Sequence, residues 1–116
     1  MITELTPDAA AMIARRFQAL SDPNRLRILY VLREREEASV GEVAAALGSS
    51  QQNVSKHLGA LYAEGFVARR KEKTSVRYWI SDPGVLELCE RICSGIERQL
   101  TELGALIAAP AASGRR

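Results

Sequence analysis

Apolar positions recur at helical spacing over most of the chain and alternate over one short stretch. Spacings of three and four residues predict helices over 7–20, 23–36, 40–47, 51–64 and 83–108. Alternation of Val76, Tyr78 and Ile80 predicts a strand over 76–80, paired with a shorter strand over 66–68. Residues 71–75 would form the hairpin tip. The pattern predicts a mainly α protein of the α+β class, with five helices and a two-stranded β-hairpin.

Local signals agree with these boundaries. Segments 6–8, 21–23 and 81–83 each place capping side chains beside a proline at a helix start. Ser39 and Glu42 fit the capping-box pattern. The helix over 23–36 is apolar at nearly every position from Ile28 to Leu32, which is typical of a buried central helix.

Size and composition limit the classes of protein to consider. The 116 residues are 47% hydrophobic and 26% charged, as in ordinary globular proteins, and suggest one domain. We expect a folded domain over 1–108 and a disordered tail over 109–116. No apolar run approaches a membrane span of about 20 residues. The first residues lack signal-peptide features, so we expect a cytoplasmic protein with reduced thiols.

Two short helices, a tight turn and a basic hairpin together indicate a winged helix-turn-helix. In the second of these helices, Val54, Leu58 and Leu61 would face the core. The opposite face presents amides, a hydroxyl and an ammonium group, which hydrogen-bond to base edges and phosphates. A merely solvated face is the alternative, although such faces usually carry more charge. The candidate DNA contacts on this helix are Gln51, Gln52, Asn53, Ser55 and Lys56.

The hairpin carries a local excess of positive charge. Residues 69–77 hold five basic side chains and one acidic one, whereas the whole chain has a net charge of only +2. Basic side chains beside a recognition helix suit phosphate contacts or insertion into the minor groove. A solvated surface is again the alternative. The candidate DNA contacts of this wing are Arg69, Arg70, Lys71, Lys73 and Arg77.

Three stretches carry a family resemblance: 17-FQALSDPNRLRIL-29, 40-VGEVAAALGSSQQNVSKHLGALYAEGFV-67 and 77-RYWISDP-83. Together they resemble the ArsR/SmtB family of bacterial repressors over roughly residues 10–95. The resemblance implies a homodimeric winged-helix repressor that binds a double-stranded DNA operator and releases it when an effector binds. It also implies dimerisation through the first and last helices, with the polar face of the fourth helix toward DNA.

The last helix has an apolar stripe that is longer than a domain of this size needs for its own core. We therefore expect this stripe to form a dimer seam, the alternative being packing on its own domain. Its members are Cys89, Ile92, Cys93, Ile96, Leu100, Leu103 and Ile107.

Cys89 and Cys93 are the candidate effector ligands. Two thiolates one helical turn apart could hold a soft metal ion or arsenite, or respond to a persulfide or an oxidant, but free cysteine also serves as a small buried hydrophobe. Both interpretations stay open. The resemblance brings no other ligand set, because residues 38–47 contain no cysteine and no histidine follows His57. We expect His57 to be a hydrogen-bonded structural residue, and no cofactor to be required.

No pattern of an enzyme is present. The chain has no phosphate-cradling glycine loop, no carboxylate pair with a clear pocket and no catalytic constellation. The alternative to a DNA-binding repressor is a winged-helix protein-interaction module whose basic surface meets an acidic partner. The polar and small side chains of the fourth helix argue against that alternative.

Overall fold

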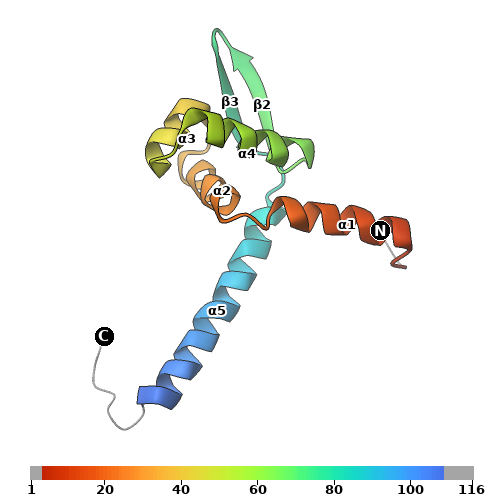
Figure 1. Cartoon of the computed structure of the whole chain (residues 1–116), viewed down its shortest axis with the longest axis vertical. Coiled ribbons are helices and arrows are strands. Elements are labelled where there is room, and N and C mark those ends of the chain that lie inside the picture. The colour runs from red at the N-terminus through yellow and green to blue at the C-terminus, as the bar shows by residue number, and fades with distance from the viewer. Residues whose placement is uncertain (1–3, 109–116) are drawn as a thin grey trace. The chain divides into compact units, whose positions relative to one another are not determined.

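The computed structural model describes residues 4–108, with side chains to Ala105. It contains the five expected helices and a small antiparallel sheet, the winged helix-turn-helix architecture (Figure 1). The elements are α1 (Pro7–Ala19), α2 (Pro23–Arg35), β1 (Ala38–Ser39), α3 (Val40–Leu47), α4 (Gln51–Ala63), β2 (Val67–Glu72), β3 (Ser75–Ile80) and α5 (Gly84–Ala108). They divide into two compact units, 1–83 and 84–116. The expected tail over 109–116 lies outside the described residues.

The expected helix starts are confirmed by side-chain caps. Thr6 Oγ1 accepts a hydrogen bond from the Ala9 amide at 3.2 Å, and Asp22 Oδ1 accepts one from the Asn24 amide at 2.7 Å. Ser39 and Glu42 form the full capping box of α3. These contacts satisfy amides that the first helical turn leaves without partners. Short helices such as α3 therefore begin at fixed residues.

The core of the first unit lies between α2 and α4. Ile28, Leu29 and Leu32 of α2 are at most 1% exposed, which confirms α2 as the central helix. Leu58 and Leu61 of α4 are fully buried, with Val54 beside them. Burying such side chains contributes roughly 1.5–3 kcal/mol each. This packing fixes the rotation of α4, so that its polar face points away from the core.

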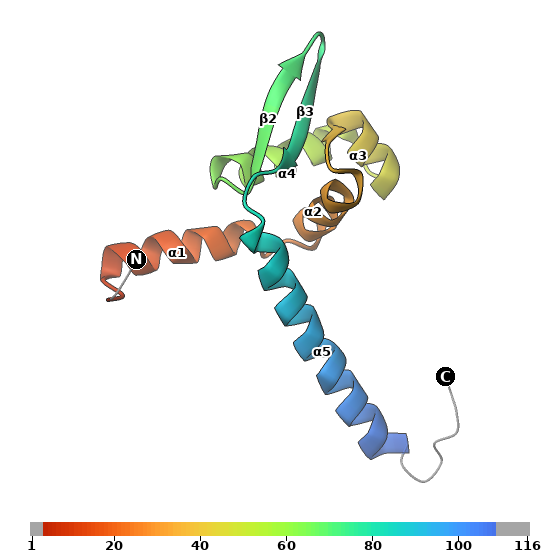
Figure 2. The same ribbon diagram turned by 180° about the vertical axis from the view of Figure 1, so that it is seen from behind.

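The sheet is larger than the sequence pattern predicts. Its strand order is β1-β3-β2, and the two-residue strand β1 was not predicted. Both hairpin strands are six residues long, so only Lys73 and Thr74 connect them. Lys73 has a φ of 59°, in the left-handed region that such tight hairpin turns require. Figure 2 shows this hairpin projecting past α4 as a narrow wing.

The two terminal helices leave large apolar side chains exposed. On α1, Met12 and Phe17 are 59% and 54% exposed. On α5, exposure reaches 50–62% at Ile92, Ile96, Leu100 and Leu103. None of the described helices is long and apolar enough to cross a membrane.

Candidate nucleic-acid interface

The polar side of α4 is open to solvent at its N-terminal end. Gln51, Gln52, Ser55 and Lys56 are all exposed, as the sequence predicts. Asn53 is half-buried, and its Nδ2 donates a hydrogen bond to Ser49 Oγ at 3.2 Å. The first two turns therefore offer two free amides, a hydroxyl and an ammonium group. These groups can read base edges in a major groove.

These side chains line one wall of a hollow of about 830 Å³. The start of α3 and the wing tip form the other walls. Its lining is mixed in polarity and includes no acidic side chain. The lining residues are Ser39, Val40, Gly41, Gln51, Gln52, Ser55, Lys56, Thr74, Ser75 and Val76.

The wing has two faces with different partners. Residues directly opposite in an antiparallel pair share a face, and neighbours along a strand alternate. The pairing register puts Arg69 and Lys71 on the same face as buried Tyr78, which we call the inner face. The same register puts Arg70 opposite Arg77 on the other, outer face. Of the five basic residues predicted as one surface, four are thus divided between two faces, and Lys73 lies in the turn that joins the strands.

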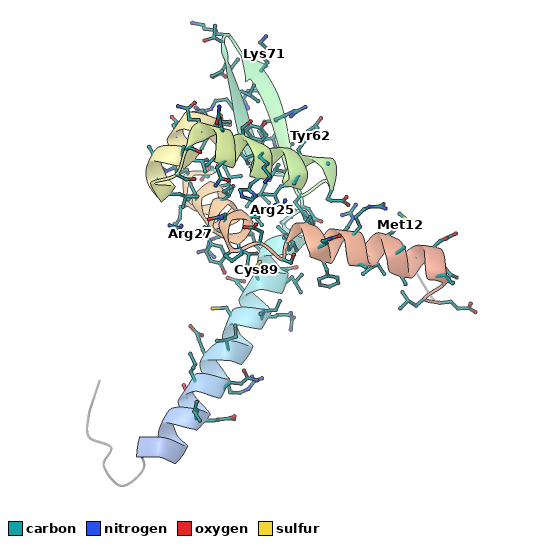
Figure 3. The ribbon with its side chains drawn as sticks, viewed as in Figure 1. Met12, Arg25, Arg27, Tyr62, Lys71 and Cys89 are labelled. Carbon is teal, nitrogen blue, oxygen red and sulfur yellow. The ribbon has the colours of Figure 1, made fainter. Side chains whose placement is uncertain are left out.

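On the inner face, Arg69 is held by aromatic side chains. Its guanidinium carbon lies 3.9 Å from the centre of the Tyr62 ring, and Tyr62 belongs to α4. A side-chain hydrogen bond with Tyr78 is the main cause that raises the pKa of Arg69. This contact ties the first part of the wing to the end of α4. Figure 3 shows Tyr62 on α4, with Lys71 farther out along the wing.

On the outer face, Arg70 and Arg77 converge on Glu37. Arg70 Nη2 and Arg77 Nε both donate to Glu37 Oε1, at 2.9 Å and 3.1 Å. Arg77 Nη1 donates to Glu42 Oε1 at 3.1 Å, and Arg70 Nη2 to Glu72 Oε2 at 3.2 Å. The bonds from Arg70, then those from Arg77, lower the pKa of Glu37. The sequence pattern does not point to Glu37, because it lies 33 and 40 positions along the chain from Arg70 and Arg77.

The lysines of this region differ from the arginines. Lys56, Lys71 and Lys73 are exposed, and within residues 4–108 none has an ion-pair or hydrogen-bond partner for its side chain. Lys71 and Lys73 lie at the outer end of the wing, and Lys56 lines the hollow. An anionic partner can meet these three ammonium groups without displacing any side-chain partner, whereas Arg69 is held by tyrosines and Arg70 and Arg77 by carboxylates.

His57 is a structural residue, as expected. It is 4% exposed on α4, and its Nδ1 accepts a hydrogen bond from Arg25 Nε at 3.0 Å. Arg25 Nη1 also donates to the Ala19 carbonyl oxygen at 3.2 Å. Arg25 belongs to α2, so this bond links the central helix to α4. Figure 3 shows Arg25 on α2.

The two cysteines of α5 do not share one environment. Cys89 is half-buried and Cys93 is exposed. Burial raises the pKa of the Cys89 thiol above its ordinary value of 9.0, which disfavours the thiolate that binds metal. Among the described residues, no group of three or more His, Cys, Asp or Glu side chains could hold a metal ion.

Known proteins resemble this chain in sequence and in structure. A family model described as a helix-turn-helix domain matches residues 20–70. A probable mercury resistance operon repressor of Streptomyces lividans is 40% identical over 75 residues, 65% of this chain. The match spans only 59% of that repressor's length. A transcriptional repressor SmtB homolog of Synechocystis is 33% identical over 90 residues, 78% of this chain and 67% of the homolog.

One solved structure extends the likeness to nearly a whole domain. It is the homodimeric winged helix-turn-helix DNA-binding domain of a possible ArsR-family transcriptional regulator from Mycobacterium bovis. It superposes with a TM-score of 0.72 at 30% identity, covering 88% of this chain and 95% of that domain. The fold defines a winged helix-turn-helix protein. The chain belongs to the ArsR/SmtB family of transcriptional regulators.

Proposed function

We propose that this chain is a dimeric transcriptional repressor that binds a double-stranded DNA operator. The observation that carries the proposal is the exposed polar end of α4 beside a hollow that is lined by Lys56 and contains no acidic side chain. In this arrangement α4 enters the major groove and the wing lies against the adjacent backbone. Both curated relatives named above are repressors, which supports the same direction of regulation.

The candidate DNA contacts are the ten sequence-predicted residues. On α4, Gln52 and Ser55 read bases and Lys56 meets phosphate. On the wing, the unpaired Lys71 and Lys73 are the best supported contacts, whereas the three arginines have partners within the protein. The full set is Gln51, Gln52, Asn53, Ser55, Lys56, Arg69, Arg70, Lys71, Lys73 and Arg77.

Dimerisation is proposed through α1 and α5. A two-fold dimer places two recognition helices about 34 Å apart, one turn of DNA. The exposed apolar side chains of α5 support this role, and the Mycobacterium bovis domain is itself homodimeric. We place the protein in the cytoplasm, where operator DNA is found, and assign it no enzymatic activity.

An anisotropy titration with DNA from the chain's own promoter region tests the proposal. We expect tighter binding to a promoter duplex than to a shuffled duplex, with affinity falling steeply as salt rises. If every promoter fragment binds no better than shuffled DNA, the repressor proposal fails. The protein-interaction module then becomes the better interpretation.

An effector is proposed at Cys89 and Cys93, with simple packing of the two thiols as the competing hypothesis. The Streptomyces relative is named for mercury resistance, which favours a soft metal or metalloid such as arsenite. Reduced protein bound to its operator should release it on addition of that ion, whereas a Cys89→Ser/Cys93→Ser variant should not. Release from both proteins alike would assign the thiols to packing.

A further inference from the structure

Glu37 is the centre of the outer-face network of the wing. Its carboxylate accepts hydrogen bonds from both Arg70 and Arg77, with a second Arg70 bond at 3.3 Å. Its carbonyl oxygen also lies 3.5 Å from Arg77 Nη2. One residue thus engages one arginine from each wing strand, β2 and β3.

The backbone fixes where Glu37 lies. It follows Glu36, which has a φ of 69° at the end of α2. The Glu37 amide donates a hydrogen bond to the Arg35 carbonyl oxygen at 2.7 Å. This tight turn leads directly into β1, which pairs with β3 through Ala38 and Ser39. Glu37 is therefore held at the edge of the sheet by main-chain geometry on both sides.

The network also reaches the helix-turn-helix. Arg77 bonds Glu42, and the same Glu42 oxygen accepts the Ser39 amide at 2.9 Å in the capping box of α3. A continuous set of contacts therefore runs from the wing strands through Glu37 and Glu42 to the start of α3. These contacts link the wing to the start of α3, the first helix of the helix-turn-helix.

Fold stability is not the main effect of these bonds. The side chains of Arg70 and Glu37 are 47% and 37% exposed, and ion pairs this open contribute little to folding. Their arrangement has a clear electrostatic effect, however. Glu37, Glu42 and Glu72 offset Arg70 and Arg77 on the outer face, while Lys71 and Lys73 carry no such carboxylate partner.

We propose that Glu37 is a positioning residue for operator binding, an inference that rests on the proposed repressor function. Glu37 holds Arg70 and Arg77 as internal struts, and these struts set the wing angle at which Lys71 and Lys73 reach the DNA backbone. Of the ten candidate DNA contacts, Arg70 and Arg77 would then act within the protein instead, and Lys71 and Lys73 would make the phosphate contacts of the wing.

The variant Glu37→Gln distinguishes two effects on DNA affinity, because they act in opposite directions. Removing a negative charge near DNA should tighten binding on charge alone, whereas loss of wing positioning should weaken operator binding by about tenfold. The matched control is Glu36→Gln, which makes the same charge change one residue away at an exposed side chain. We expect the control to bind as tightly as wild type or slightly tighter. Equal tightening in both variants would overturn the proposal.

Salt dependence separates struts from contacts. In a dimer, Lys73→Gln removes two phosphate contacts and should lower the slope of log K against log salt by about 2. Arg70→Gln should weaken binding without changing that slope, and its effect should not add to that of Glu37→Gln. A slope lowered by Arg70→Gln as much as by Lys73→Gln would show that Arg70 contacts phosphate.

A measurement without DNA tests the positioning directly. Amide hydrogen exchange in β2 and β3 should be faster in Glu37→Gln than in Glu36→Gln, with the α2 and α4 amides unchanged. Unchanged exchange in the wing would overturn the role of Glu37. If the wild-type protein binds no operator while exchange in the wing is still faster in Glu37→Gln than in Glu36→Gln, the proposed function is refuted but the role of Glu37 in positioning the wing is not.

Discussion

Helices α4 and α5 carry the same apolar spacing and meet opposite environments. Val54 and Leu58, four residues apart on α4, are at most 1% exposed. Ile92 and Ile96, four residues apart on α5, are 55% and 50% exposed. Amphipathic spacing identifies which face of a helix has to be buried, but it does not identify the element or the partner that packs against and covers this face. For α4 the cover is the chain's own α2 and sheet, and for α5 we propose a second copy.

The largest effect is expected where cover is complete. Leu58→Ala should lower the free energy of unfolding by about 2–5 kcal/mol, because it leaves a cavity at a fully buried site. Urea denaturation followed by circular dichroism measures the change. The loss should be the same at every protein concentration, since the site is covered within one chain. A concentration-dependent loss would mean that this core too depends on a partner.

The next largest effect is expected on α5. Leu100→Lys puts a charge at a side chain that is 62% exposed in one chain and should weaken dimerisation by at least about 2 kcal/mol. Sedimentation equilibrium measures the dimer dissociation constant. The control, Thr101→Lys, adds the same charge about 100° around the helix from Leu100, outside the apolar stripe, and should leave the dimer intact. Equal behaviour of the two variants would remove the stripe as the dimer seam.

A smaller effect is expected on the uncovered face of α4. Gln52→Ala should weaken operator binding by about 1–3 kcal/mol, because an amide that pairs with a base edge is lost. Binding to shuffled DNA should not change. Anisotropy titrations on the two duplexes measure the difference. Equal losses on both duplexes would refute direct reading of bases by Gln52.

The smallest effect concerns thiol chemistry on α5. Because burial raises the pKa of Cys89, its alkylation by iodoacetamide should be slow near neutral pH, and the midpoint of its rate against pH should lie above the ordinary thiol pKa of 9.0. Exposed Cys93 should react faster in the Leu100→Lys monomer than in the dimer, by several-fold. Mass spectrometry resolves the two sites. Equal Cys93 rates in monomer and dimer would leave that position outside the seam.

Most of the fold follows from sequence pattern, and the exceptions have physical causes. The five helices begin within one residue of their predicted starts, and side-chain caps mark the starts of α1, α2, α3 and α4 locally. Strand β1 could not be predicted from the sequence, because two residues are too few to show an alternation of apolar and polar positions. The hairpin strands were predicted too short because charged residues at 69–72 hide the alternation in hydropathy.

The separation of the wing's basic residues onto two faces can be predicted in part from the sequence. Once the strand is extended to Glu72, alternation alone separates Arg70 from Arg69 and Lys71. The partners could not be read in the same way. Glu37 reaches the wing only after β1 pairs with β3, and His57 meets Arg25 only when α2 and α4 pack together. Such contacts depend on tertiary structure and leave no local signal.

The turn at the wing tip sets stability and function against each other. Lys73 occupies the left-handed region, which costs an ordinary residue roughly 1–2 kcal/mol and which glycine adopts without steric conflict. Lys73→Gly would therefore relieve the turn and remove an unpaired cation in one step. A search for stabilising substitutions would select that change, and the resulting protein would fold well while holding its operator less tightly. At this position, the residue that serves the fold best is not the residue that serves the proposed binding of DNA.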